Sequence, residues 1–224
     1  MSAVLTDAFC TNVRAPQTDG GLPCVRTLVD ERAQDGLYTP FGDEAVRQGA
    51  KRLYLPTLDI PEPTLDALIE YALTNDAQIL AACSTTLEEA GIIDSRFKKS
   101  PVMLLYECGL LDRCTVVGGV YLDKDDLALM AQEGVPLVVC PSFDAGYGRG
   151  VAPVAAALKA GLEVRLGTAD GAFNSAHSVL SEAVYLRLLV SAQLNKKDAL
   201  PLEALSKMAA GEEDDEIIKR IICK

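Results

Sequence analysis

Short apolar runs alternate with helical segments along most of this chain, and this alternation constrains its fold more than any other feature. Strand-like runs occur at residues 24–29, 52–56, 78–83, 115–122, 136–140 and 163–167. Several of these runs are apolar on both faces, which is typical of parallel strands covered by helices. We therefore predict an α/β fold with an open parallel sheet of about six strands, wrapped by helices.

Helix boundaries are marked by capping residues. Ser100 and Gly109 bracket one predicted helix, and Asp123 and Gly134 bracket another. The sequence contains no linker that would divide it, so we predict one domain over residues 22–224. Residues 1–21 have the composition of turns and predict an irregular N-terminal arm.

Composition excludes several classes of partner. The formal net charge is −11 in 224 residues, and a polyanion repels nucleic acid and acidic membrane surfaces. The first ten residues lack the basic and apolar regions of a signal peptide, which predicts a cytoplasmic location. The seven cysteines form no C-x-x-C pair and are interpreted as buried core residues, with a thiolate metal site as the alternative.

Two stretches rich in glycine carry a family resemblance. CPSFDAGYGRGVAP at 140–153 and VRLGTADGAFN at 164–174 resemble the amidohydrolase superfamily, in its branch of chlorohydrolases and cytosine, adenosine-homocysteine and guanine deaminases. The resemblance runs from about Leu22 to about Gly211 and covers the third to eighth strands of the family's barrel. It implies an amidohydrolase-like, incomplete TIM-type β/α barrel of about six strands.

The resemblance also implies a reaction that this chain is not equipped for. Members of the family hold a divalent metal with several histidines and one aspartate, whereas His177 is the only histidine here. The run at 78–83 resembles the fifth strand, where a metal histidine is followed three residues later by a glutamate. The corresponding pairs here are Ala82 with Thr85 or Ala81 with Ser84, and neither restores those residue types.

The sixth and eighth strands show the same loss. The family's metal histidine falls on Gly118, a substrate-side histidine falls on Tyr121, and the metal aspartate falls on Ala169. Asp170 follows one residue later, and strand alternation predicts that it points to the other side. We therefore predict no cofactor and no metal at the family's position, because alanine and glycine offer no ligand atoms.

A small molecule is the predicted ligand, bound at the carboxyl ends of the strands. The candidate ligand-binding residues are Tyr121, Asp144, Arg149, Asp170, Asn174 and His177. Structural interpretations stand beside these roles. His177 is expected to be a surface or capping residue, Tyr121 to pack its ring, and Glu88 and Glu89 to form a solvated helix face.

Three hypotheses for function follow. The first is a non-catalytic relative, a pseudoenzyme that retains a pocket or an interaction surface. The second is an active C–N hydrolase with a rebuilt metal site from Asp144, Asp170 and His177. The third is an incomplete subunit whose barrel is closed by a partner chain, for which a homodimer covering the gap between residues 24–29 and 163–167 is expected.

Overall fold

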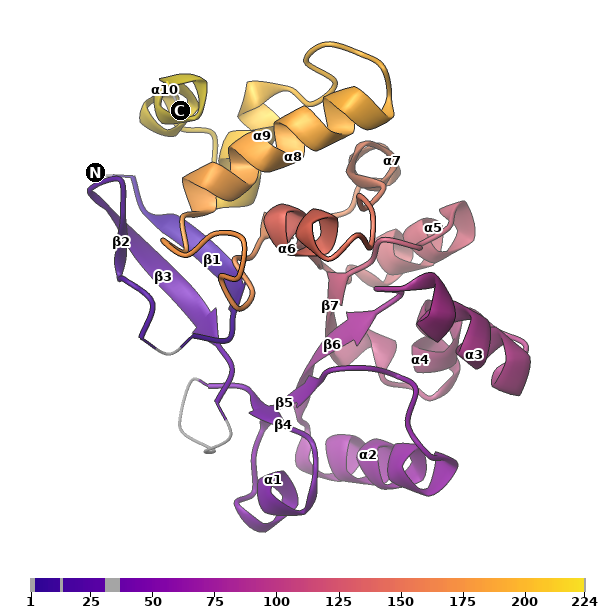
Figure 1. The fold of residues 1–224 in the computed structure, drawn as a ribbon. Coiled ribbons are helices and arrows are strands. Elements are labelled where there is room, and N and C mark those ends of the chain that lie inside the picture. Colours follow the sequence, from indigo (N-terminus) through magenta and orange to yellow (C-terminus); the bar gives the residue numbers. More distant parts are fainter. Residues whose placement is uncertain (1–2, 13, 31–36, 224) are drawn as a thin grey trace.

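This computed structural model describes residues 3–12, 14–30 and 37–223, and parallel strands form its centre (Figure 1). Six of the strands form one sheet in the order β4-β5-β6-β7-β8-β9, so the predicted α/β fold with a six-stranded parallel sheet is confirmed. These strands are β4 Thr39–Pro40, β5 Arg52–Leu55, β6 Gln78–Cys83, β7 Cys114–Gly118, β8 Leu137–Val139 and β9 Val164–Leu166.

The residues before position 30 form a second sheet that joins both edges of the first. Its strands are β1 Leu5–Cys10, β2 Thr18–Asp19 and β3 Leu22–Leu28, with β1 parallel to β3. Parallel bridges connect Cys10 to Ala169 beyond β9 and Val29 to Tyr38 before β4. The order β1-β3-β4-β5-β6-β7-β8-β9 is therefore a closed ring.

This arrangement corrects the expectation for residues 1–21. The segment is not an irregular arm, because β1 fills the predicted gap between residues 24–29 and 163–167 and pairs with strands on both sides. The backbone N–H groups of Thr168 and Ala169 both donate to the carbonyl of Phe9 at 3.0 Å. Residues 1, 2 and 13 of the segment lie outside the described residues. The homodimer stays a prediction, but the open edges that motivated it are paired within the chain.

Helices cover most of the outside of the ring. They are α1 Asp43–Arg47, α2 Glu62–Asn75, α3 Leu87–Phe97, α4 Pro101–Glu107, α5 Lys124–Glu133, α6 Pro141–Gly146, α7 Val154–Ala160, α8 Val179–Gln193, α9 Leu202–Ala210 and α10 Asp215–Cys223. Within the described ranges, none is long and apolar enough to span a bilayer.

The helical layer is incomplete beside β3. The described residues between β1 and β3 form turns and β2 rather than a helix, and Figure 1 shows the helices along the other sides of the ring. The side chain of Val25 on β3 is accordingly 63% exposed. The barrel is therefore thinner here than a full β/α unit would make it.

Local signals account for the helices that the sequence predicts well. The Ser100 hydroxyl accepts from the backbone N–H of Met103 at 3.1 Å, and Asp123 forms a capping box with Asp126. Inside the ring, a compact apolar cluster that includes Leu80, Val117 and Val138 fills the barrel. This packed interior forms the bottom of the candidate site described below.

Candidate functional site

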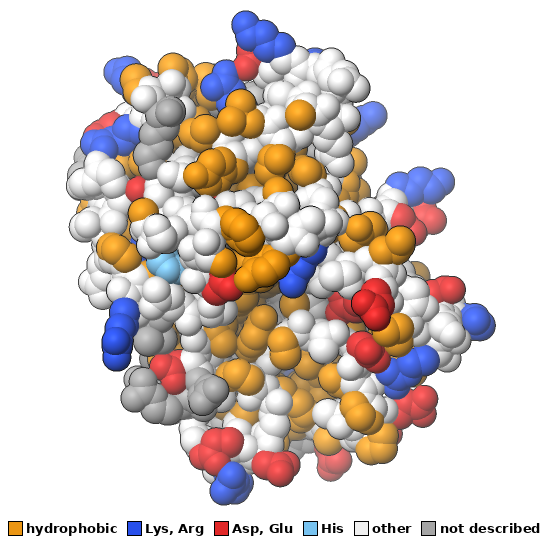
Figure 2. Space-filling model, viewed as in Figure 1, with side chains coloured by type: hydrophobic (Ala, Val, Ile, Leu, Met, Phe, Trp, Pro, Cys, Tyr) orange, Lys and Arg blue, Asp and Glu red, His pale blue; other side chains and the backbone are white. Residues whose placement is uncertain are grey.

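A pocket of about 360 Å³ opens at the carboxyl ends of the barrel strands. In Figure 2, hydrophobic side chains gather in the hollow at the centre of this face, and charged side chains lie mainly around it. The lining residues are Phe9, Thr11, Tyr54, Pro56, Ala82, Thr85, Val117, Gly118, Cys140, Phe143, Asp144, Arg149, Ala169 and Asp170. This is the face where barrels of this type bind their ligands.

The three positions without metal ligands all face this pocket. Ala82 at the end of β6, Gly118 at the end of β7 and Ala169 beyond β9 are among its lining residues. Thr85 lines the pocket as well, whereas Ala81 is fully buried in the outer core. Of the two alignments left open by the sequence, the structure therefore places the pair Ala82 and Thr85 at the site.

At Gly118, the space for a side chain is occupied. Its φ is +88°, a region that favours glycine, and a Cβ built there would lie 2.7 Å from Cγ2 of Thr85. Any larger residue at this position would have to displace Thr85. The position is therefore closed to a ligand side chain in the present packing.

A buried carboxylate, Glu89, holds Thr85 in this position, and the sequence analysis did not predict this role. Glu89 on α3 is 6% exposed and was wrongly expected on a solvated face; Glu88 is exposed as predicted. The Glu89 carboxylate accepts from the N–H and hydroxyl of Thr85 at 3.0 and 3.1 Å. It also accepts from the Leu58 N–H and the Thr57 hydroxyl at 3.1 Å. Four donors make burial of this charge tolerable.

One ion pair lines the opposite wall of the pocket. Asp144 on α6 is 3% exposed, and its carboxylate lies 3.6 Å from Nη1 of Arg149. Burial raises the pKa of Asp144 to about 6, and the nearby guanidinium opposes that rise. The guanidinium of Arg149 lies over the ring of Phe143 at 4.7 Å and that of Tyr147 at 5.7 Å.

Tyr121 supports this wall from behind. Its hydroxyl donates to the Arg149 carbonyl at 2.8 Å, and the side chain is not among the residues that line the pocket. In the structure Tyr121 therefore stabilises the loop that carries Arg149.

Asp170 faces the pocket, contrary to the expectation from strand alternation. It lies beyond the end of β9, where Ala169 has a φ of +49° and the regular alternation has stopped. One carboxylate oxygen of Asp170 accepts from the Ala172 N–H at 2.8 Å, and the side chain is exposed.

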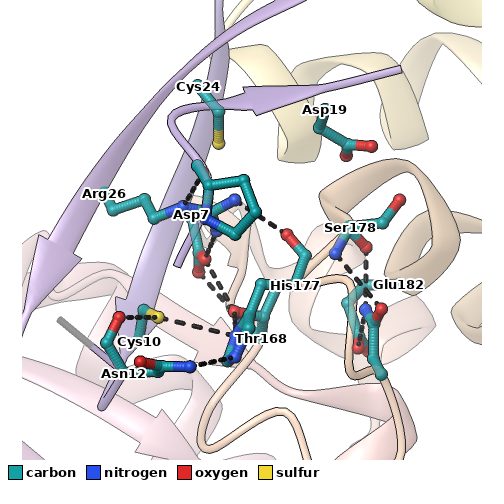
Figure 3. A network of polar contacts seen from close by, with 12 residues as sticks. Asp7, Cys10, Asn12, Asp19, Cys24, Arg26, Thr168, His177, Ser178 and Glu182 are labelled. Atoms are coloured by element: carbon teal, nitrogen blue, oxygen red, sulfur yellow. Dashed lines mark hydrogen bonds and ion pairs between the residues drawn. The ribbon is translucent and has the colours of Figure 1, made fainter. Parts of the chain in front are cut away.

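His177 is not the surface residue that the sequence predicts. It is 2% exposed and lies in a polar network between the end of β1 and the segment before α8 (Figure 3). Its Nε2 lies 3.0 Å from Nδ2 of Asn12, whose Oδ1 accepts from the Arg14 N–H. Because Asn12 thus donates, His177 accepts at Nε2 and carries its proton on Nδ1, 3.0 Å from the Thr168 hydroxyl.

The same network continues to a buried ion pair. The Thr168 hydroxyl and N–H both donate to the Asp7 carboxylate, at 2.7 and 3.0 Å. Arg26 on β3 pairs with that carboxylate and donates to the His177 carbonyl at 2.9 Å. Burial raises the pKa of Asp7 and lowers the pKa of His177. These contacts join β1, β3 and the end of β9, so they secure the closure of the ring.

Asn174 belongs to a neighbouring buried cluster. Its amide donates to the Glu182 carboxylate at 2.8 Å, and Glu182 also accepts from the Ser142 N–H at 2.9 Å. Burial raises the pKa of Glu182. This cluster ties α8 to the start of α6.

Of the six predicted ligand-binding residues, the pocket brings together Asp144, Arg149 and Asp170. Tyr121, Asn174 and His177 serve the surrounding framework. The sequence missed the aromatic lining, although Tyr54 could have been recognised as a polar ring within the apolar strand 52–56.

The donor set does not fit the metal that the resemblance implies. Within the described part of the chain, no three His, Cys, Asp or Glu side chains are grouped to hold a metal ion. His177 is not a lining residue, and both of its ring nitrogens have partners. Of the residues proposed for a rebuilt centre, Asp144 and Asp170 line the pocket but His177 does not join them.

Comparison with known proteins gives the class of the fold first. No family model matches the chain. A solved adenosine deaminase from Xanthomonas campestris with bound zinc aligns over 87% of this chain and 46% of its own, with a TM-score of 0.65 and 19% identity. A guanine deaminase from C. acetobutylicum aligns over 88% and 52%, with a TM-score of 0.64 and 16% identity. The fold is that of an amidohydrolase barrel.

Sequence comparison is consistent with this class. A 5-methylthioadenosine/S-adenosylhomocysteine deaminase from Caldicellulosiruptor saccharolyticus is 26% identical over 210 residues, 93% of this chain. One from Thermococcus onnurineus is 36% identical over 107 residues, 47% of this chain and 25% of its own length. The chain spans about half the length of the first of these relatives, 46%. In fold and sequence it is similar to the amidohydrolase superfamily, in the branch of the methylthioadenosine/adenosylhomocysteine deaminases, chlorohydrolases and guanine deaminases.

Proposed function

We propose that this chain is a non-catalytic, small-molecule-binding member of its superfamily. The observation that carries the proposal is the composition of the pocket at Ala82, Gly118 and Ala169, which contribute no metal-ligand side chain. Thr85 in addition fills the space beside Gly118. Metal-bound water is the nucleophile in metal-dependent hydrolysis, so losing these ligands removes the means of activating it.

The remaining pocket suits a compound with one flat ring system. Its volume of about 360 Å³ is at the small end of the range for ligand sites. Phe9 and Tyr54 lie with ring centroids 5.6 Å apart, and Phe143 lines the same space. Aromatic walls favour flat ligands. Purines and triazines are the natural first ligands to test, because solved proteins of similar fold include a guanine deaminase and a triazine hydrolase.

The decisive experiment measures metal content, turnover and binding on the same preparation. The protein is equilibrated with zinc, dialysed and assayed by elemental analysis. Ammonia and chloride release are then followed with methylthioadenosine, guanine and a chlorotriazine. We expect no stoichiometric zinc and no metal-dependent turnover. About one zinc per chain, together with turnover that Asp170→Asn abolishes, would refute the proposal.

Binding is measured by calorimetry with the same compounds, and a matched pair of variants locates it. Tyr54→Phe removes one hydroxyl from the pocket, and Tyr106→Phe removes one from the exposed side of α4. Loss of one hydrogen bond of about 1 kcal/mol corresponds to a roughly fivefold weaker affinity. We expect that loss for Tyr54→Phe alone. Equal affinities for both variants would place the ligand elsewhere.

A further inference from the structure

The pocket carries more negative than positive charge. Its charged lining residues are Asp144, Asp170 and Arg149, which sum to −1 when all are ionised. The distribution is uneven, because Arg149 lies 3.6 Å from Asp144 and stacks over Phe143 and Tyr147. Arg149 therefore compensates the buried Asp144, and the charge of Asp170 is left over.

Among the described residues, Asp170 has one backbone contact and no ion-pair partner. Its carboxylate accepts from the Ala172 N–H at 2.8 Å, and none of the ion pairs between described residues includes it. A carboxylate has about four acceptor sites, so most of those on Asp170 are open to a ligand.

Two hydroxyl groups of the pocket have acceptor and donor sites that no described residue uses. No hydrogen bond between described residues involves the hydroxyl of Tyr54 or of Thr11, and both side chains line the pocket. The faces of Phe9 and Tyr54 carry negative quadrupole density, which attracts a cation placed over them. The carboxylate, the hydroxyl oxygens and the ring faces thus all favour a positively charged ligand.

Resting on the small-molecule function proposed above, we propose that the ligand is a small organic cation, an amine or a protonated ring nitrogen, whose positive charge lies beside Asp170. Its apolar part lies against the aromatic wall of the pocket. The net charge of −11 on the whole chain acts in the same direction, because it attracts cations toward the surface.

Three probes of one shape separate charge from fit: benzylamine, benzyl alcohol and benzoate, each titrated into the full chain by calorimetry or NMR near neutral pH. We expect benzylamine to bind roughly fivefold more tightly than benzyl alcohol, the size of one partly exposed ion pair. Benzoate should bind most weakly. The advantage of benzylamine should shrink at high salt.

Variants assign the preference to residues. Asp170→Asn is expected to remove the advantage of benzylamine and to leave benzyl alcohol unchanged. Glu70→Gln removes the same charge from an exposed site on α2 and should change neither affinity. Asp144→Asn frees the guanidinium of Arg149, so benzoate should gain affinity severalfold while benzylamine loses it.

Each outcome bears on a stated claim. Equal affinity for benzylamine and benzyl alcohol, or an Asp170→Asn variant that keeps the preference, overturns the inference and leaves small-molecule binding intact. Failure of all three probes overturns it as well, and the heterocycle titrations then decide the proposed function separately. A preference for benzoate in the unmodified protein would show that Arg149 dominates the site.

Discussion

The ion pair between Asp7 and Arg26 is expected to be the strongest single support of the closed ring. The Arg26 side chain is 4% exposed and that of Asp7 is 0% exposed. Asp7 also accepts two hydrogen bonds from Thr168, and Arg26 donates to the carbonyls of Pro16 and His177. Replacing Asp7 by alanine would leave a guanidinium buried without its counter-charge.

The expected loss follows from that burial. Removing one partner of a buried pair costs about 3–5 kcal/mol, because the other charge stays desolvated. For a chain of this size, that loss corresponds to a melting temperature lower by roughly 6–20 °C. Asp7→Ala is measured by urea unfolding followed by circular dichroism. Asp59→Ala is the control, because its pair with Arg96 is 28–44% exposed and should contribute less than about 1 kcal/mol.

A double-mutant cycle tests the reasoning itself. Arg26→Met replaces the guanidinium by an apolar side chain, so the combination with Asp7→Ala leaves no charge unpaired. We expect the double variant to lose at least about 1 kcal/mol less than the sum of the single losses. Additive losses, or an Asp7→Ala variant as mildly affected as Asp59→Ala, would refute the view that this pair secures the ring.

Three further perturbations test the walls of the pocket. The pKa of Asp144 is about 6 when folded, above its ordinary value of 3.8. Its proton-linked stabilisation is therefore fully present well below pH 3.8 and is lost as the pH rises through 6. Between about pH 4 and about pH 7, the unfolding free energy of the unmodified protein relative to Asp144→Asn should fall by roughly 2 kcal/mol. A difference that does not change with pH would contradict the burial of this group. Gly118→Ala should lower the free energy of unfolding in urea by about 1–3 kcal/mol, because the new Cβ meets Thr85. Adding Thr85→Ser to this variant removes Cγ2 and should restore part of the lost stability. If no stability is restored, the contact with Thr85 is not the cause of the loss. Glu89→Gln should lower the free energy of unfolding, measured by calorimetric melting, by about 2 kcal/mol, whereas Glu88→Gln should change it by no more than about 0.5 kcal/mol. Equal effects of the two variants would contradict the arrangement of four donors around Glu89.

Local sequence signals predicted most of the fold but not its closure. Apolar strands and capped helices follow short-range rules, and β5, β6, β8 and β9 lie within the predicted runs. β7 begins one residue before its predicted run and ends at Gly118, and β4 was not predicted. β1 was missed because its pattern is irregular. Asp7 interrupts the apolar residues, and the pairing with β3 shifts between Asp7 and Cys10. Its other neighbour lies about 160 residues away, beyond β9, and local patterns carry no information on that pairing.

Part of the candidate site could likewise be predicted from the sequence, and part could not. Ala82, Gly118 and Ala169 could be placed at the mouth of the barrel because strand ends fix their position. The surroundings of His177 could not be predicted, because its partners Asn12 and Thr168 come from opposite ends of the chain. For Glu88 and Glu89, two identical residues in sequence, only the three-dimensional contact with Thr57 and Leu58 decides which one is buried.

If the chain is non-catalytic as proposed, a single substitution should not restore a metal site, because the three positions at the strand ends lack ligand side chains and Thr85 already occupies the space beside Gly118. A histidine at Gly118 would meet Thr85, and Thr85 is held by Glu89. The backbone of Ala169 is held by hydrogen bonds at both groups: its N–H donates to the Phe9 carbonyl in β1, and its carbonyl accepts from the N–H of Thr11 just beyond β1. Arg149 already pairs with Asp144, so that carboxylate is engaged and not free to bind a metal ion. Restoring one ligand at Gly118 would therefore add a strained side chain against Thr85 without supplying the other ligands.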